Sequence, residues 1–193
     1  MKKHVIKICQ AAYFELKCIC SIGFLIEDAA KTLATSYILS RLDYCNCLLM
    51  GTPNSVIQSL QKIQNFAARL VLLAPRHQHS TPLLEKLHFV LISERIKYKV
   101  ACMYFNAING SGPVYLPEML HVYISSRALR FFSDTRMLKI KQYKLKTHVF
   151  HTFSCFGPHI WNSLPQNLRH CSTLSSFKDK LKTFLLSQYF HTN

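Results

Sequence analysis

The chain is poor in acidic residues and in glycine. Its 193 residues include 9 Asp and Glu against 24 Lys and Arg, giving a formal net charge of +15, and only 5 are glycine. Scarce glycine argues against a turn-rich sandwich or barrel and favours helices. So large a positive excess predicts a polyanionic partner, RNA or DNA before a membrane surface.

Long apolar runs are also missing. A membrane-spanning helix needs about 20 apolar residues, and the longest run here, residues 66–74, is interrupted by Arg69. Lys7, Glu15 and Lys17 interrupt any signal-peptide core near the start of the chain. We therefore expect a cytoplasmic or nuclear protein with no membrane partner, in which thiols stay reduced.

The chain contains 8 cysteines and 10 histidines, but their spacing is not typical of metal ligands. The pairs Cys18/Cys20 and Cys45/Cys47 are each separated by one residue, whereas structural zinc sites usually place two to four residues between paired ligands. Residues two apart on a helix also point away from each other. We expect free thiols, no bound metal and no cofactor, with a zinc site as the alternative.

Apolar residues recur at helical spacing through the first 110 residues. The pattern predicts long helices over residues 4–21 and 27–48, a third from Asn54 or Ser55 to about Ala74, and a fourth that begins at Ser93 and ends at Gly110. The first helix has such a face in Val5, Ile8, Ala12, Leu16 and Ile19, and the second in Ala30, Leu33, Tyr37 and Ile38. A short helix is expected from Thr81-Pro82 through Leu87. The cleanest apolar stripe belongs to the third helix and consists of Val56, Leu60, Ile63, Ala67, Leu70 and Val71.

The character of the chain changes after residue 112. Residues 121–149 have no sustained helical period, and short strands are expected at Val122–Ile124 and Met137–Tyr143. A last amphipathic helix follows Ser172 or Thr173. The predicted fold is mainly α: an irregular helical bundle over residues 1–112, then a small, basic, aromatic and irregular α+β unit over residues 113–193.

Three residues are predicted to be structural anchors: Trp161, Asp43 and Arg69. Trp161 is the only tryptophan, and it lies between Pro158 and Pro165. A run with this composition favours a bend whose indole ring is buried. Asp43 follows an apolar helix face and is either a metal ligand or, as we prefer, the partner of Arg41 or Arg69, because burying an unpaired carboxylate is costly.

The candidate nucleic-acid contacts lie in the basic stretch from Arg127 to Lys146. Lys and Arg suit phosphates, and aromatic faces suit unstacked bases. The alternative is a solvated strand pair whose aromatic rings face inward. The amides of Gln61, Gln64 and Asn65 also allow two interpretations: they contact RNA, or they bond neighbouring helices or loop backbone. The members of the basic stretch are Arg127, Arg130, Arg136, Lys139, Lys141, Lys144 and Lys146, with Phe131 and Tyr143 among them.

Eight segments, taken in order, resemble the post-thumb C-terminal region of reverse transcriptases from non-LTR (long interspersed, jockey- and chicken-repeat-like) retrotransposons. The resemblance implies a piece of an RNA-directed DNA polymerase that helps to hold template RNA or target DNA, with the rest of that polymerase as its partner. The chain departs from the family pattern at Phe89-Val90-Leu91 and between Phe131 and Lys144. The eight segments are residues 40–46, 60–71, 81–89, 95–99, 112–116, 127–130, 157–165 and 177–183.

Paired catalytic carboxylates are absent from the sequence. Polymerase chemistry needs two metal ions on adjacent carboxylates, but the aspartates Asp28, Asp43, Asp134 and Asp179 are isolated from one another. We therefore expect a non-catalytic fragment, not an enzyme by itself, that binds nucleic acid. The alternative is a helical structural or protein-interaction remnant with no nucleic-acid role.

Overall fold

The structure is a computed structural model that describes the chain apart from residues 1, 24, 124–135, 141–152 and 191–193. Helices account for 72% of the described residues, so the predicted mainly helical class is confirmed. Backbone contacts divide the chain into two compact units. The first is Met1–Ile96 with Phe190–Asn193, the second is Lys97–Tyr189, and the boundary at residue 96 falls inside helix α6 (Ile92–Ile108). The change of sequence character after residue 112 lies within the second unit.

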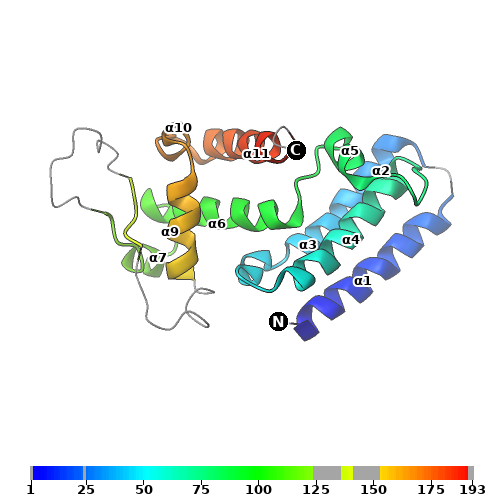
Figure 1. The fold of residues 1–193 in the computed structure, drawn as a ribbon, viewed down its shortest axis with the longest axis horizontal. Helices are drawn as coiled ribbons and strands as arrows, with labels where there is room; N and C mark the ends of the chain where they lie inside the picture. Colours follow the sequence, from blue (N-terminus) through cyan, green and yellow to red (C-terminus); the bar gives the residue numbers. More distant parts are fainter. Residues whose placement is uncertain (1, 24, 124–135, 141–152, 191–193) are drawn as a thin grey trace. The chain divides into compact units, whose positions relative to one another are not determined.

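The first unit is built from helices that lie side by side (Figure 1). Helix α1 packs against α4 and against the continuous rod formed by α2, η1 and α3. The elements are α1 (Lys2–Ser21), α2 (Glu27–Leu33), the π-helical segment η1 (Ala34–Leu39), α3 (Ser40–Asp43), the 3-10 turn η2 (Asn46–Leu49), α4 (Asn54–Val71), α5 (Ser80–Lys86) and the first residues of α6.

The apolar stripes predicted for the first and third helices are the faces that pack. Helix α1 is confirmed, and its five predicted apolar positions, from Val5 to Ile19, are all buried. Helix α4 is confirmed as well, with Leu60, Ile63 and Ala67 at 1% exposure or less. Helices α1 and α4 contact each other and bury these stripes, as expected because burial of apolar surface is the main favourable term in packing.

The prediction of a single α-helix over residues 27–48 is wrong in two respects, the type of helix and the residue at which it ends. The rod becomes π-helical through η1, and it ends at Asp43, after which Cys45 takes a left-handed backbone with φ 53°. A π-helical turn contains more residues than an α-helical turn, so it rotates the following side chains. Tyr37, expected on the apolar face, lies in this segment and is 55% exposed.

The second unit is also helical. It contains the remainder of α6, α7 (Tyr115–Glu118), α9 (Phe153–Ser163), α10 (Gln166–Arg169) and α11 (Leu174–Phe190). The predicted start of the last helix is confirmed, because the Thr173 hydroxyl accepts a hydrogen bond from the Ser176 N–H at 3.3 Å. In the core of the second unit, Phe105 stacks on Phe177 with ring centroids 4.5 Å apart, and the Trp161 ring centroid lies 6.0 Å from that of Phe177.

The bend predicted around Trp161 is wrong, because this segment is helix α9 with Pro158 inside it. Proline lacks an N–H donor and disfavours a helix interior. The buried residues of helix α9 are Cys155, Gly157, Pro158, Ile160 and Trp161. Burial of that apolar face outweighs the lost backbone bond, and the helix ends at Ser163, before Pro165.

The predicted α+β character of the C-terminal unit is not seen in the described residues. They contain one antiparallel bridge, between Val122 and Leu138, and no strand. The bridge does join the two segments that were expected to be strands, and the rest of each, Ile124 and residues 141–143, lies outside the described residues. No helix in the described part of the chain is long and apolar enough to cross a membrane.

Candidate nucleic-acid interface

The structure describes two of the nine residues predicted to contact nucleic acid, Arg136 and Lys139. Lys139 is exposed and Arg136 is half-buried. The other predicted contacts lie outside the described residues: Arg127, Arg130, Phe131, Lys141, Tyr143, Lys144 and Lys146.

The backbone around Arg136 and Lys139 is fixed by helix α9. The Trp161 indole N–H donates to the Arg136 carbonyl at 2.7 Å. The Asn162 side chain pairs with Leu138 in both directions, accepting from its N–H at 3.0 Å and donating to its carbonyl at 2.8 Å. Asn162 therefore satisfies one backbone edge of this segment, as a neighbouring strand would.

The opposite edge of the segment pairs with the residues before it. The Tyr123 N–H donates to the Met137 carbonyl at 2.8 Å, and the Lys139 N–H donates to the His121 carbonyl at 2.7 Å. The segment is thus hydrogen-bonded on both edges, Leu138 is buried, and Lys139 is exposed to solvent. Lys139 is thus presented from a fixed backbone, an arrangement that suits contact with a phosphate.

Arg136 has a different role in the described structure. Its Nη1 donates to the Arg169 carbonyl at 2.8 Å, at the C-terminal end of α10. A cation is favourable there because the last carbonyls of a helix carry partial negative charge. The Arg169 guanidinium is itself buried, at 7% exposure, and contacts the Met137 sulfur. Arg136 therefore stabilises the packing next to the candidate interface.

The sequence prediction missed Asn162 and Arg169. Asn162 directly follows the only tryptophan, and a polar residue next to a buried anchor was the available signal. Arg169 had no such signal, since a basic residue in a basic chain is expected at the surface.

Trp161 has no exposed surface, and Tyr104, on helix α6, is also completely buried. The Tyr104 hydroxyl donates to the Phe153 carbonyl at 2.7 Å, and the two rings lie 4.6 Å apart. Burial, followed by the nearby Cys155, raises the pKa of Tyr104. A neutral, hydrogen-bonded phenol thus lies in the core beside Gly157. Because Trp161 is completely buried, its ring has no exposed face for a ligand.

Asp43 is paired with a residue that the sequence analysis did not name. The Arg95 Nε donates to its Oδ1 at 2.8 Å, and Nη2 contacts Oδ2, so the pair is bidentate. The prediction of Arg41 or Arg69 is wrong: Arg41 pairs with Glu15, and the Arg69 Nη2 donates to the Gln78 carbonyl at 3.0 Å. The fork of Arg95 matches both carboxylate oxygens, which favours this distant partner.

Side-chain amides of α4 form hydrogen bonds with the loop backbone, which was the alternative to RNA contact in the sequence prediction. The fully buried Gln64 donates to the Val90 carbonyl at 2.8 Å, and Gln61 accepts from the Ile92 N–H at 3.0 Å. Gln61 also donates to Gln64 and to Asn65, at 3.0 and 2.8 Å. This network fixes the chain between α5 and α6.

Neither a metal centre nor a paired acidic site is found in the described part of the chain. It contains no group of three or more His, Cys, Asp or Glu side chains placed to hold a metal ion. Asp28, Asp43 and Asp179 lie on three separate helices, and Asp134 is outside the described residues. The cysteines Cys102, Cys155 and Cys171 are buried free thiols, and burial raises the pKa of Cys102.

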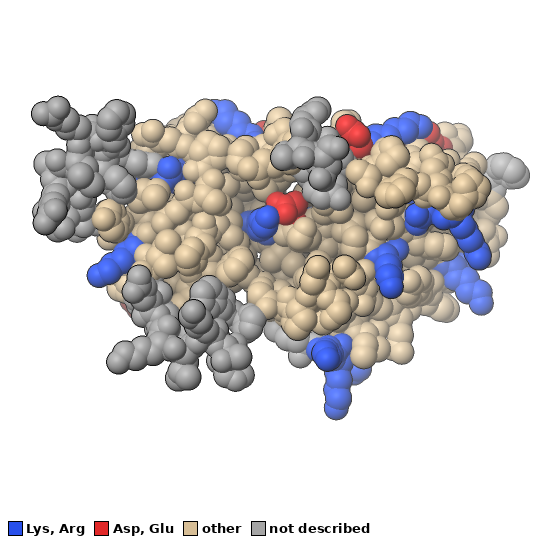
Figure 2. Space-filling model, in the orientation of Figure 1, with Lys and Arg blue, Asp and Glu red and all other residues tan. Residues whose placement is uncertain are grey.

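Positive charge is the dominant electrostatic feature, but among the described residues on the face drawn in Figure 2 it is dispersed. Blue Lys and Arg side chains lie singly or in small groups, with few red acidic side chains among them. The sequence, in contrast, concentrates seven basic residues and one acid, Asp134, between residues 127 and 146.

Comparison of the chain with protein-family models, with curated proteins and with solved structures found no match.

Proposed function

We propose that this chain is the non-catalytic C-terminal region of a retrotransposon-type RNA-directed DNA polymerase, and that it binds RNA or DNA through the basic segment 127–146 in the cytoplasm or nucleus. The observation on which this depends is the charge: a net +15 overall, with seven basic residues against one acid in this segment. Phosphate contacts of this kind give affinity without sequence specificity.

The polar contacts described above support the proposal, because each of them involves a segment on which the resemblance rests. Asp43 and Arg95 connect the first of those segments to the fourth. Gln64, in the second, bonds the backbone just after the third. Trp161, in the seventh, bonds the backbone of Arg136. Such residues serve a scaffold, and a scaffold that presents Lys139 from a bonded backbone suits the holding of a nucleic acid.

The same contacts support a role without catalysis. Asp43 is the aspartate with the most family-like surroundings, and its carboxylate is occupied by Arg95 and by Asn46, which donates to it at 3.0 Å. A carboxylate engaged in this way is not available to a catalytic metal ion. In the parent polymerase, a separate palm domain would supply the paired aspartates.

The test compares RNA binding by the wild-type chain with that of a variant in which Lys139, Lys141 and Lys144 are changed to Gln. Binding of a fluorescein-labelled single-stranded RNA is measured by anisotropy over a range of salt concentrations. Each lost phosphate contact removes about 0.7 from the slope of log affinity against log salt. The variant should therefore bind unrelated sequences equally weakly, with a slope smaller by about 2.

A matched control changes Lys2, Lys3 and Lys17 to Gln, which removes the same charge from helix α1. This control should keep most of the wild-type slope. If the two variants behave alike, the segment 127–146 has no special role. If the wild-type chain does not bind RNA or DNA, a structural or protein-interaction role becomes the better account.

A further inference from the structure

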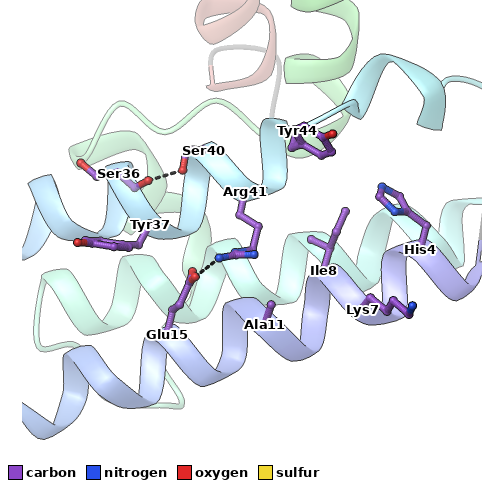
Figure 3. A pocket seen from close by; sticks show the side chains of 10 residues that line it. All are labelled: His4, Lys7, Ile8, Ala11, Glu15, Ser36, Tyr37, Ser40, Arg41 and Tyr44. Carbon is purple, nitrogen blue, oxygen red and sulfur yellow. Dashed lines mark hydrogen bonds and ion pairs between the residues drawn. The ribbon is translucent and has the colours of Figure 1, made fainter.

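A groove in the first unit lies between α1 and the rod formed by η1 and α3. Its volume is about 620 Å³. Figure 3 shows α1 forming one wall, while side chains from Ser36 to Tyr44 form the other. The Arg41–Glu15 ion pair crosses the groove between its two walls.

Two exposed tyrosines mark the ends of this groove. Tyr37 and Tyr44 are 55% and 67% exposed, and Figure 3 shows one at each end with Arg41 between them. Seven residues on a helix correspond to roughly 10 Å, so the two rings are far enough apart to contact two different bases. Exposed aromatic rings on one wall of a basic groove are a typical platform for unpaired bases.

The groove also contains both positive charge and one free acceptor. Lys7 and His4 are exposed on the α1 wall. The Glu15 Oε1 is bonded by Arg41, but its Oε2 is buried and has no hydrogen-bond partner among the described residues. A buried acceptor without a partner is costly, and a ligand that supplies a donor there would remove that cost.

We propose that this groove binds a short stretch of single-stranded RNA, with bases against Tyr37 and Tyr44 and a phosphate beside Lys7. The proposal rests on the nucleic-acid role proposed above and adds a second contact surface, outside the segment 127–146. RNA meets all three features of the groove at once. Its bases stack, its phosphates are anionic, and its base N–H groups and 2′-hydroxyls donate hydrogen bonds to an acceptor such as Glu15 Oε2.

An acidic peptide or inorganic phosphate fits less well. Either would satisfy Lys7, but neither can use the rest of the groove: Arg41 is already paired with Glu15, and Glu15 would repel a further carboxylate or phosphate oxygen. Neither places an aromatic face on both tyrosines. The combination of a carboxylate acceptor with two exposed rings therefore favours a ligand that carries both bases and phosphates.

The test uses the full chain and two fluorescein-labelled probes: a 12-nucleotide oligo(U) RNA and an abasic oligomer with the same number of phosphates. The variant Tyr37→Ser/Tyr44→Ser is compared with Phe14→Ser, which removes an aromatic side chain that is 69% exposed on α1 and lines no part of this groove. The tyrosine variant should bind oligo(U) at least tenfold more weakly. It should bind the abasic oligomer as the wild-type chain does, with an unchanged salt slope, because stacking releases no counterions.

A second readout does not depend on a variant. Oligo(U) that contains 5-iodouridine is cross-linked to the wild-type chain by light, and the modified peptides are identified by mass spectrometry. Cross-links should fall on Tyr37 or Tyr44. If the chain binds oligo(U) but the tyrosine and Phe14 variants bind equally well and the cross-links fall elsewhere, the groove proposal is wrong while the proposed function stands. If the wild-type chain binds neither probe, both fail.

Discussion

At the scale of single residues, Gly157 occupies a position with no room for a side chain. A Cβ built there would lie 2.1 Å from the Tyr104 ring, and Tyr104 is fully buried with its hydroxyl bonded to Phe153. The ring cannot move aside without losing that bond. The close approach of α9 to α6 in the second unit therefore depends on this glycine.

We predict that Gly157→Ala lowers the free energy of unfolding by about 3 kcal/mol, as expected when a packed core is overfilled. Urea denaturation followed by Trp161 fluorescence measures this. The control is Gly112→Ala, whose added Cβ would meet its nearest atom at 3.4 Å, and this variant should change stability by less than about 1 kcal/mol. Equal stability of the two variants would contradict the packing described here.

Asp43 and Arg95 form the second residue-scale feature that can be tested. Their side chains are 25% and 20% exposed, and the contact is bidentate. A double-mutant cycle with Asp43→Asn and Arg95→Gln should give a coupling energy of about 1–3 kcal/mol, because charged hydrogen bonds shielded from water are stronger than exposed ones.

The control cycle uses Glu27 and Lys86. This pair is 3.5 Å apart, with side chains 51% and 63% exposed. Exposed pairs of this kind contribute little, so its coupling energy should be below about 0.5 kcal/mol. If the coupling energy of Asp43 and Arg95 is no larger than that of the control pair, the contact does not stabilise the fold.

Sequence reasoning at the residue scale succeeded where a pattern is local. The buried positions of α1 follow directly from the spacing of apolar residues. The need for an ionic partner at Asp43 was also correctly inferred from the cost of burying a carboxylate. The identity of that partner was not, because Arg95 is 52 residues away and no local pattern reports a contact over such a separation.

At the scale of elements, two helices end with a non-glycine residue in a left-handed backbone. Leu73 follows α4 with φ 49°, and His88 follows α5 with φ 55°. In both cases the next N–H bonds back to the final turn, as the Phe89 N–H does to the Leu84 carbonyl at 2.8 Å. This is the Schellman arrangement, in which glycine is the preferred residue.

We predict that His88→Gly raises the free energy of unfolding by about 0.5–1 kcal/mol, because glycine adopts this backbone without steric cost. His88 is exposed, so little packing is lost. The control, Glu85→Gly in the same helix, should lower stability by about 1 kcal/mol. Thermal denaturation of the two variants checks the signs, and destabilisation by both would contradict the observed helix end.

The long helices were predictable because one face of each is regularly apolar. The exceptions are the rod over residues 27–43 and helix α9. In the rod, a π-helical segment shifts the register, which apolar periodicity alone does not reveal. In α9, the local preference of Gly157 and Pro158 for a bend is overruled by burial of that turn against Tyr104, and burial is set by the tertiary structure.

At the scale of the whole molecule, charge is the property that the sequence determines most completely. The excess of 24 basic over 9 acidic side chains needs no structure to be recognised. The arrangement that presents Lys139 does need one, because the Trp161 and Asn162 contacts join helix α9 to residues 136–138 across 24 or 25 positions. The groove lined by Tyr37 and Tyr44 was not predictable either, since Tyr37 had been assigned to the core.

The salt dependence of nucleic-acid binding by the unmodified chain tests the central claim most directly. Affinity for a single-stranded RNA is measured between low and moderate salt. If about five phosphates are contacted, log affinity should fall against log salt with a slope near −3.5, and unrelated sequences should give the same slope. An affinity that does not change with salt, or no binding at low salt, would contradict the account and leave the helical protein-interaction role in its place.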